Sequence, residues 1–227
     1  MRLPPATAPY SSRVRYGRYV ARRVRRARLE SLAVDLDKAN KELLSTGRAC
    51  DDAGGPVQDA LADRDAADDD LDAAAQQARA NMAGRSVDAV RTEPYLPIFH
   101  EGISYYTAAP LEQQVPRYTE LKKRLVEYLP AKDPVRISTV KDIDTGLKAF
   151  QDAAKALSDA RTDESLAYTR LVTATEAWER QIEKTYGALV AEFGRARANG
   201  FFPRVGGKKA GKKQDASADV AGAPANA

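Results

Sequence analysis

Residues 13–43 read RVRYGRYVARRVRRARLESLAVDLDKANKEL, and this stretch decides the fold. Its second half carries apolar side chains at alternating intervals of three and four residues: Leu29, Leu32, Leu36, Ala39 and Leu43. Such spacing is typical of a packed amphipathic helix. Traced backwards, the same face carries Arg25, Arg22 and Arg18. We therefore predict one helix whose packed face changes from leucine to arginine near residue 29 and which ends near Thr46 and Gly47.

Charge is segregated along the chain. Residues 1–29 hold nine arginines and no acidic residue, whereas residues 51–72 hold nine aspartates and a single base, Arg64. Charged residues make up 30% of the chain and much of the apolar share is alanine, a mixture that suits exposed helices joined by thin seams. The net charge of +4 therefore hides two surfaces of opposite sign.

A turn is predicted at residues 50–56, CDDAGGP, because glycine, proline and aspartate cluster there. A second helix over residues 57–84 would then carry the aspartates and complete a first hairpin over residues 13–84. With the turn centred near Gly54, Arg28 falls about two helical turns beyond Asp72. Most of the arginines would have no partner inside this hairpin.

The middle of the chain, residues 85–138, holds six of the twelve prolines and is predicted to be a joint rich in proline and aromatic residues, with a short helix over residues 116–129. Residues 139–198 lack proline and repeat the seam spacing. They predict either one helix of about 90 Å or a hairpin, and the helix-start signal at Thr162 favours the hairpin.

The predicted fold class is all-α: an elongated antiparallel helical bundle or a set of helical hairpins with coiled-coil-like seams. The two halves share an outline, which suggests an internal duplication. We expect a flexible N-terminus over residues 1–12 and a disordered tail rich in lysine and alanine over residues 199–227.

Several classes of protein are disfavoured by composition. Cys50 is the only cysteine, so no internal disulfide can form, and we interpret it as an incidental thiol in a loop. No stretch approaches the ~18 apolar residues of a membrane span. The arginine-rich start lacks the apolar core of a secretory signal, and it resembles an organellar transit peptide in composition alone. We expect a soluble, cytoplasmic protein.

Residues for catalysis are scarce. His100 is the only histidine, which excludes a histidine triad or a multi-histidine metal site within one chain. It lies in residues 95–106, YLPIFHEGISYY, whose aromatic side chains we interpret as the packed end of the bundle rather than a binding loop. The common phosphate-loop, dinucleotide, hydrolase and zinc motifs are absent. We predict no enzyme, no cofactor and no small-molecule substrate.

Helical spacing aligns the aspartates in rows that could hold Mg²⁺ or Ca²⁺, but the run lacks an EF-hand pattern and a nearby histidine. We interpret it as a solvated face or a docking surface for arginines, and predict no metal site. The residues of this acidic face are Asp59, Asp63, Asp65, Asp69 and Asp72.

The basic stretch suits an anionic partner. Arginine pairs with phosphate and tyrosine stacks on bases, so nucleic acid is one suitable partner. The stretch is also weakly amphipathic, which would suit binding to an anionic membrane surface. Protein carboxylates, including those of a second copy, fit best.

Our main prediction is a non-catalytic helical scaffold or assembly protein that acts through the arginine-rich arm and the acidic face. The alternative is a nucleic-acid-binding accessory protein. The predicted partner-binding residues are Arg13, Arg15, Tyr16, Arg18, Tyr19, Arg22, Arg23, Arg25, Arg26, Lys208, Lys209, Lys212 and Lys213.

Overall fold

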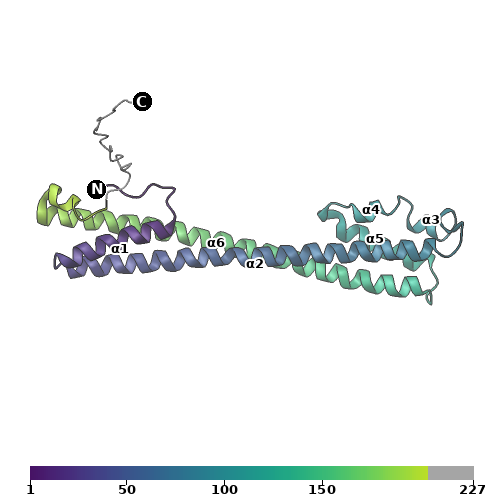
Figure 1. The fold of residues 1–227 in the computed structure, drawn as a ribbon. Helices are drawn as coiled ribbons and strands as arrows, with labels where there is room; N and C mark the ends of the chain where they lie inside the picture. The colour runs from purple at the N-terminus through teal and green to yellow at the C-terminus, as the bar shows by residue number, and fades with distance from the viewer. Residues whose placement is uncertain (204–227) are drawn as a thin grey trace, which may run out of the picture. The chain divides into compact units, whose positions relative to one another are not determined.

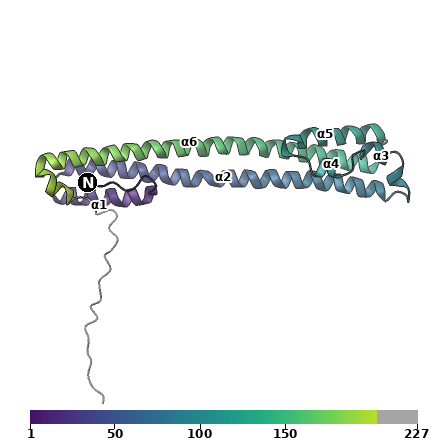
Figure 2. The same cartoon turned by 90° about the horizontal axis from the view of Figure 1, so that it is seen from above.

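The computed structural model describes residues 1–203, and in this range the chain is all-α, without a strand (Figures 1 and 2). The all-α prediction is therefore confirmed. The chain divides into two compact units, residues 1–44 with the segment from residue 175 onward, and residues 45–174. The helices are α1 (Tyr10–Arg26), α2 (Glu30–Ala83), η1 (Ala89–Arg91), α3 (Tyr95–Ile98), α4 (Ser104–Thr107), α5 (Leu111–Tyr128) and α6 (Pro134–Asn199).

In the first unit, α1 folds back along the start of α2. The chain reverses at residues 27–29, where Arg28 adopts a left-handed conformation with φ of 64°. The single helix predicted across residue 29 is therefore wrong. The reason is that α1 has an apolar face of its own, turned away from the arginines, which includes Val14, Val20 and Val24 and is buried in the hairpin.

Gly17 lets α1 approach its neighbours closely. A Cβ atom at this position would lie 1.9 Å from Asn40 Oδ1 and 2.9 Å from Trp178 Nε1. Behind it, the buried Trp178 Nε1 donates a hydrogen bond of 2.8 Å to Asn40 Oδ1. The core of this unit is completed by fully buried aliphatic side chains from α2 and α6: Leu36, Leu43, Ile182 and Leu189.

The N-terminal residues are held against this unit rather than flexible as predicted. The amino group of Met1 donates to Asn199 Oδ1 at 2.6 Å, and Tyr16 OH donates to the carbonyl of Arg2 at 2.9 Å. Arg13 donates to three more carbonyls in this segment. Four backbone carbonyls before α1 therefore accept hydrogen bonds from side chains of α1, and Asn199 of α6 accepts one from the terminal amino group.

The second unit is built around α2 and α6, which run antiparallel with Leu71 beside Gly146. The short helices and α5 pack on this pair (Figure 1). Its core joins Leu71 and Met82 of α2 to Ile143 and Phe150 of α6, and it includes Tyr95, Ile98, Phe99, Tyr106, Tyr118, Leu121 and Leu125. The interpretation of the aromatic stretch as packed core is confirmed.

The turn predicted at residues 50–56 is wrong, because α2 runs through it without a break. Pro56 lies inside the helix, where it removes one backbone hydrogen bond. A proline also disfavours helical backbone at the residue before it, largely through that residue's Cβ, and Gly55 has none. On the neighbouring turns, Val57 and Ala60 pack against Leu157 of α6. The glycines and proline thus form part of a helix rather than a loop, and Cys50 lies on that helix.

The hairpin favoured at Thr162 is also wrong, and the alternative of one long helix is confirmed. Thr162 does not cap a helix; its hydroxyl donates to the carbonyl of Ser158 at 2.9 Å, four residues back in α6. The helix extends from Pro134 to Asn199 with one kink at Gly194, where φ is 75°. Since neither predicted hairpin forms, a duplication of two hairpins is not the architecture.

Two smaller boundaries differ from the predictions. Helix α5 begins at Leu111 rather than residue 116, with Pro116 inside it, and α6 begins at Pro134 rather than residue 139. The start of α6 is capped, because the backbone N–H of Val135 donates to Asp133 Oδ1 at 2.9 Å. Among the described residues, no helix is long and apolar enough to span a membrane.

Candidate interaction surfaces

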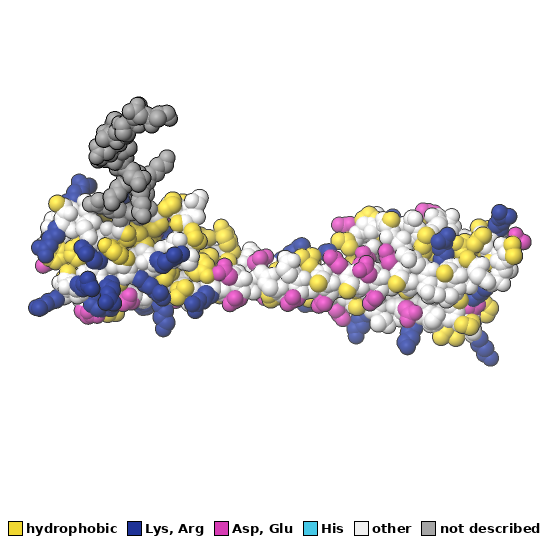
Figure 3. Space-filling view, viewed as in Figure 1, with side chains coloured by type: hydrophobic (Ala, Val, Ile, Leu, Met, Phe, Trp, Pro, Cys, Tyr) yellow, Lys and Arg dark blue, Asp and Glu magenta, His cyan; other side chains and the backbone are white. Residues whose placement is uncertain are grey.

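The outer side of α1 carries a row of arginines, which we define as the arginine row: Arg15, Arg18 and Arg22. All three are exposed, since their spacing of three and four residues places them opposite the buried valines. Tyr19 lies beside them, 45% exposed. Within residues 1–203 the row makes no ion pair, and Arg15 Nε donates only to the carbonyl of Ser11. Figure 3 shows Lys and Arg side chains gathered over this part of the molecule.

Arginines at the end of α1 have partners. Arg25 donates to Asp37 Oδ2 at 2.7 Å and to Glu30 Oε1 at 3.0 Å, and these hydrogen bonds raise the pKa of Arg25. Arg23 donates to the carbonyl of Gly200 at 3.1 Å. Both side chains are exposed, and Arg25 already pairs with two carboxylates.

Two of the predicted partner-binding residues are buried instead. Arg13 is 3% exposed and donates to Glu179 Oε1 at 2.5 Å as well as to carbonyls of the N-terminal segment. Tyr16 is 6% exposed and meets Trp178 edge-on, with ring centroids 6.0 Å apart, and burial raises the pKa of Tyr16 to about 12. Both hold the first unit together, because they lie on the inner side of α1. The predicted lysines at 208, 209, 212 and 213 lie outside the described residues.

The aspartates of the predicted acidic face lie on α2, and they differ in exposure. Asp59, Asp63, Asp65 and Asp69 are exposed. Asp72 is half-buried, and Tyr118 OH of α5 donates to its Oδ1 at 2.5 Å. Burial raises the pKa of Asp72, and this effect outweighs the Tyr118 hydrogen bond. Asp72 therefore also joins α2 to α5 within the second unit.

The neighbouring Asp68, which the sequence did not distinguish, is turned partly inward. One of its carboxylate oxygens is buried without a hydrogen-bond partner among the described residues. Its pKa is raised, first by burial and then by the charges of Asp72, Asp69 and Asp65. No local pattern marks Asp68, since its burial depends on the position of α5. In the part of the chain described, no group of three or more His, Cys, Asp or Glu residues could hold a metal ion.

The region around His100 forms an internally paired cluster. Arg124 donates to Glu120 Oε1 at 2.7 Å, and Tyr105 OH donates to Glu120 Oε2 at 2.8 Å. His100 Nε2 lies 3.1 Å from Glu101 Oε1. The Arg117 guanidinium lies 4.4 Å from the Tyr105 ring centroid. The contacts of Tyr105 join α4 to α5, and His100 and Glu101 pair with each other in the loop before α4, so these polar groups hold the unit together.

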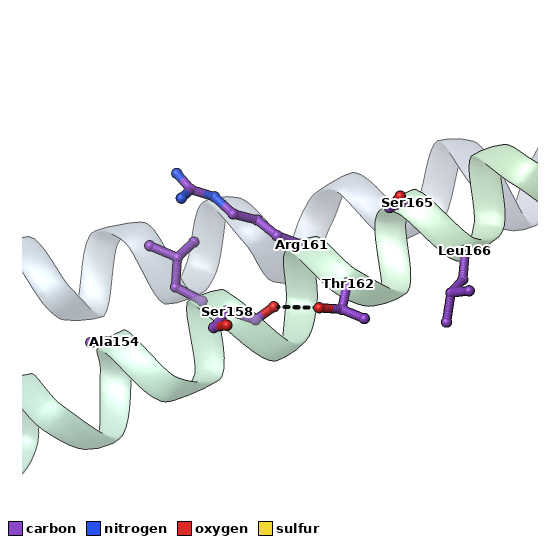
Figure 4. A pocket seen from close by; sticks show the side chains of 7 residues that line it. Ala154, Ser158, Arg161, Thr162, Ser165 and Leu166 are labelled. Carbon is purple, nitrogen blue, oxygen red and sulfur yellow. Dashed lines mark hydrogen bonds between the residues drawn. The ribbon is translucent and has the colours of Figure 1, made fainter.

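A shallow hollow of about 470 Å³ lies on α6 in the second unit (Figure 4). Its hydroxyl groups come from Ser158, Thr162 and Ser165, and its one charged group is Arg161. The Thr162 hydroxyl is bound to the helix backbone, and no carboxylate or histidine lines the hollow. The lining therefore lacks a base that could activate a hydroxyl.

Comparison with protein-family models, with curated proteins and with solved structures yielded no match to this chain.

Proposed function

We propose that this chain is a non-catalytic helical assembly protein, in which α1 of one copy docks on α2 of a second copy. The observation that supports the proposal is the presence of two rows of opposite charge on helices, both exposed except at the half-buried Asp72. The arginine row occurs in a helix without an acidic residue, and the second row, which we define as the aspartate row, is Asp65, Asp69 and Asp72.

The spacing of the two rows supports this pairing. The arginine row is spaced by three and four residues, and the aspartate row by four and three. When two helices dock antiparallel, Arg22 therefore faces Asp65, Arg18 faces Asp69 and Arg15 faces Asp72. Arg64 donates to Asp65 Oδ1 and Tyr118 donates to Asp72 Oδ1, which leaves the other oxygen of each carboxylate as an acceptor. Guanidinium and carboxylate groups can pair through two parallel hydrogen bonds.

The proposed contact joins two different surfaces, so it is heterologous. Each copy then offers one arginine row and one aspartate row, and contacts of this kind generate rings or open filaments. Three exposed ion pairs contribute about 0.6–3 kcal/mol together. The contact is accordingly weak and reversible, and salt weakens it because the screening length falls from about 10 Å at 0.1 M to about 3 Å at 1 M salt.

The absence of catalysis is part of the proposal. It is supported by the single histidine, which faces Glu101, and by the polar groups near it, which are bound to one another.

The first experiment measures assembly by sedimentation velocity at low and high salt, over protein concentrations up to about 1 mM, at which a contact of about 3 kcal/mol joins roughly a tenth of the copies. We expect species larger than a monomer at low salt that dissociate as salt rises. Changing the arginine row together (Arg15→Gln, Arg18→Gln and Arg22→Gln) should abolish them. The matched control is the triple change Lys38→Gln, Lys41→Gln and Lys184→Gln, which alters net charge equally on exposed positions outside α1.

The second experiment tests which acidic surface is used. Asp65→Asn with Asp69→Asn should abolish assembly, whereas Asp59→Asn with Asp63→Asn should leave most of it. The decisive sample mixes the arginine-row variant with the Asp65/Asp69 variant. Each retains one competent surface, so the mixture should form a 1:1 pair and nothing larger. A salt-insensitive monomer, or a mixture without the pair, would contradict the proposal.

In the alternative, the same arginine row binds nucleic acid. Fluorescence anisotropy with a labelled DNA duplex and a labelled single-stranded RNA distinguishes this alternative from assembly. If the wild type binds either at physiological salt, and the arginine-row variant loses that binding while assembly is unaffected, the row serves phosphates rather than carboxylates. The assembly proposal would then be wrong.

A further inference from the structure

A second basic feature of the first unit is a pocket where α1 and α6 end. Its volume is about 470 Å³, within the range of small-molecule sites. No acidic side chain lines it. The lining residues are Arg23, Arg26, Ala27, Ala196, Arg197, Gly200 and Phe201.

Two of the three arginines are held in place without a carboxylate. Arg23 donates one hydrogen bond of 3.1 Å to the carbonyl of Gly200. The Arg197 guanidinium lies 4.6 Å from the Phe193 ring centroid, and Phe193 stacks on Phe201 with centroids 5.6 Å apart at 15°. Within residues 1–203, none of the three makes an ion pair. Arg23 and Arg197 thus each have a contact that orients the side chain, and none of the three charges is paired with a carboxylate.

Such an arrangement suits a phosphate group. A guanidinium carries five N–H donors in a planar fork, which matches the oxygens of phosphate, and two of these forks are already oriented. Preorganisation of this kind lowers the entropy lost on binding. The pocket also exceeds what one inorganic phosphate fills, and its lining includes Phe201, which is 8% exposed. The ligand therefore has room for an organic part beside the phosphate.

We propose that this pocket binds a small phosphate monoester, with its phosphate between Arg23, Arg26 and Arg197. The site is separate from the arginine row, because Arg15, Arg18 and Arg22 do not line it. The proposal goes beyond assembly and does not depend on it. Arginines in the last turn of a helix also stabilise that helix through its dipole, so the test has to separate ligand binding from helix stability.

The test is isothermal titration calorimetry on the full chain with three probes: inorganic phosphate, AMP and adenosine, at matched ionic strength. We expect AMP to bind, inorganic phosphate to bind more weakly, and adenosine not to bind. Loss of one charged hydrogen-bond donor should weaken AMP binding by about tenfold to a hundredfold in Arg23→Gln and in Arg197→Gln. Arg18→Gln is the matched control on α1 and should leave AMP binding unchanged.

Circular dichroism of each variant without ligand shows whether the helices persist. A variant that retains its helices and loses AMP binding supports the site. The proposal is overturned if neither AMP nor inorganic phosphate binds at concentrations up to about 10 mM, because this is about ten times a dissociation constant of 1 mM. It is also overturned if Arg18→Gln weakens binding as much as Arg23→Gln, because that result indicates non-specific attraction.

Discussion

The close approach of α1 at Gly17 makes Gly17→Ala the sharpest test of the first unit. The added methyl carbon would lie 1.9 Å from Asn40 Oδ1 and 2.9 Å from Trp178 Nε1, so the helix or the buried Asn40 side chain has to move. Overpacking of this kind costs about 1–3 kcal/mol. If Asn40 moves away, the buried Trp178 N–H also loses its acceptor, at about 1–3 kcal/mol.

An opposing term reduces this cost, because alanine favours a helix over glycine by about 1 kcal/mol. The net expectation is a loss of about 3 kcal/mol in the free energy of unfolding, and a fall in Tm of about 6–12 °C for a chain of this size. Trp178 is the only tryptophan and is fully buried, so its fluorescence during urea unfolding reports on this unit directly.

Gly187→Ala is the matched control, since nothing lies within 4 Å of the added carbon at that helical position. It should stabilise by up to about 1 kcal/mol. The double variant Gly17→Ala with Asn40→Ala should cost less than the sum of the two single changes, because the second change removes the atoms that the methyl meets. If Gly17→Ala proves as stable as Gly187→Ala, the described packing of α1 on Asn40 is wrong.

Three further features are tested by substitution: the proline in α2 and the bond between Tyr118 and Asp72 by thermal unfolding, and the contacts of Arg13 by proteolysis. Pro56→Ala should raise the free energy of unfolding by about 1–3 kcal/mol, because it restores a backbone hydrogen bond in α2. Gly55→Ala should destabilise the wild type, because the new Cβ conflicts with the proline ring. The same change should stabilise the Pro56→Ala variant, which has no such ring. Tyr118→Phe should lower the free energy of unfolding by about 1–3 kcal/mol at pH 7. Burial already raises the pKa of Asp72, and loss of the hydrogen bond raises that pKa further. As pH falls towards the ordinary aspartate range, Asp72 is therefore protonated in the folded state before it is in the unfolded chain, and the cost of the substitution shrinks. A pH-independent cost would contradict this account. Arg13→Met should release the N-terminal residues, seen as faster proteolysis before α1 than in Arg18→Gln.

The sequence predicted the helical class and most of the buried face, because apolar spacing reports directly on which side of a helix packs. Leu36 and Leu43 are on the face that the spacing predicts to be packed, and both are fully buried. Tyr168 lies in residues 139–198, which repeat the seam spacing, yet it is 63% exposed. Periodicity gives the side of a helix but does not say whether another helix covers it.

The turns were harder to predict, because the signals for turn and helix overlap. Glycine, aspartate and proline at residues 50–56 have low helix propensity, yet α6 packs beside them and the tertiary contacts outweigh propensity. The true reversal at residues 27–29 carries no glycine or proline and depends on Arg28 adopting a positive φ. The division of the arginines into buried Arg13 and exposed Arg15, Arg18 and Arg22 followed only once that reversal was known.

Residues 158–173 of α6 include no buried side chain. On the facing turn of α2, Gly54 lies near Glu164 of α6. Helices ordinarily lose backbone amide protection first at their ends. Here the packed cores that oppose opening lie on either side of this stretch in the sequence. Amide protons near residues 161–170 should therefore exchange with deuterium sooner than those near Phe150 or Ile182, so that this helix opens from its middle.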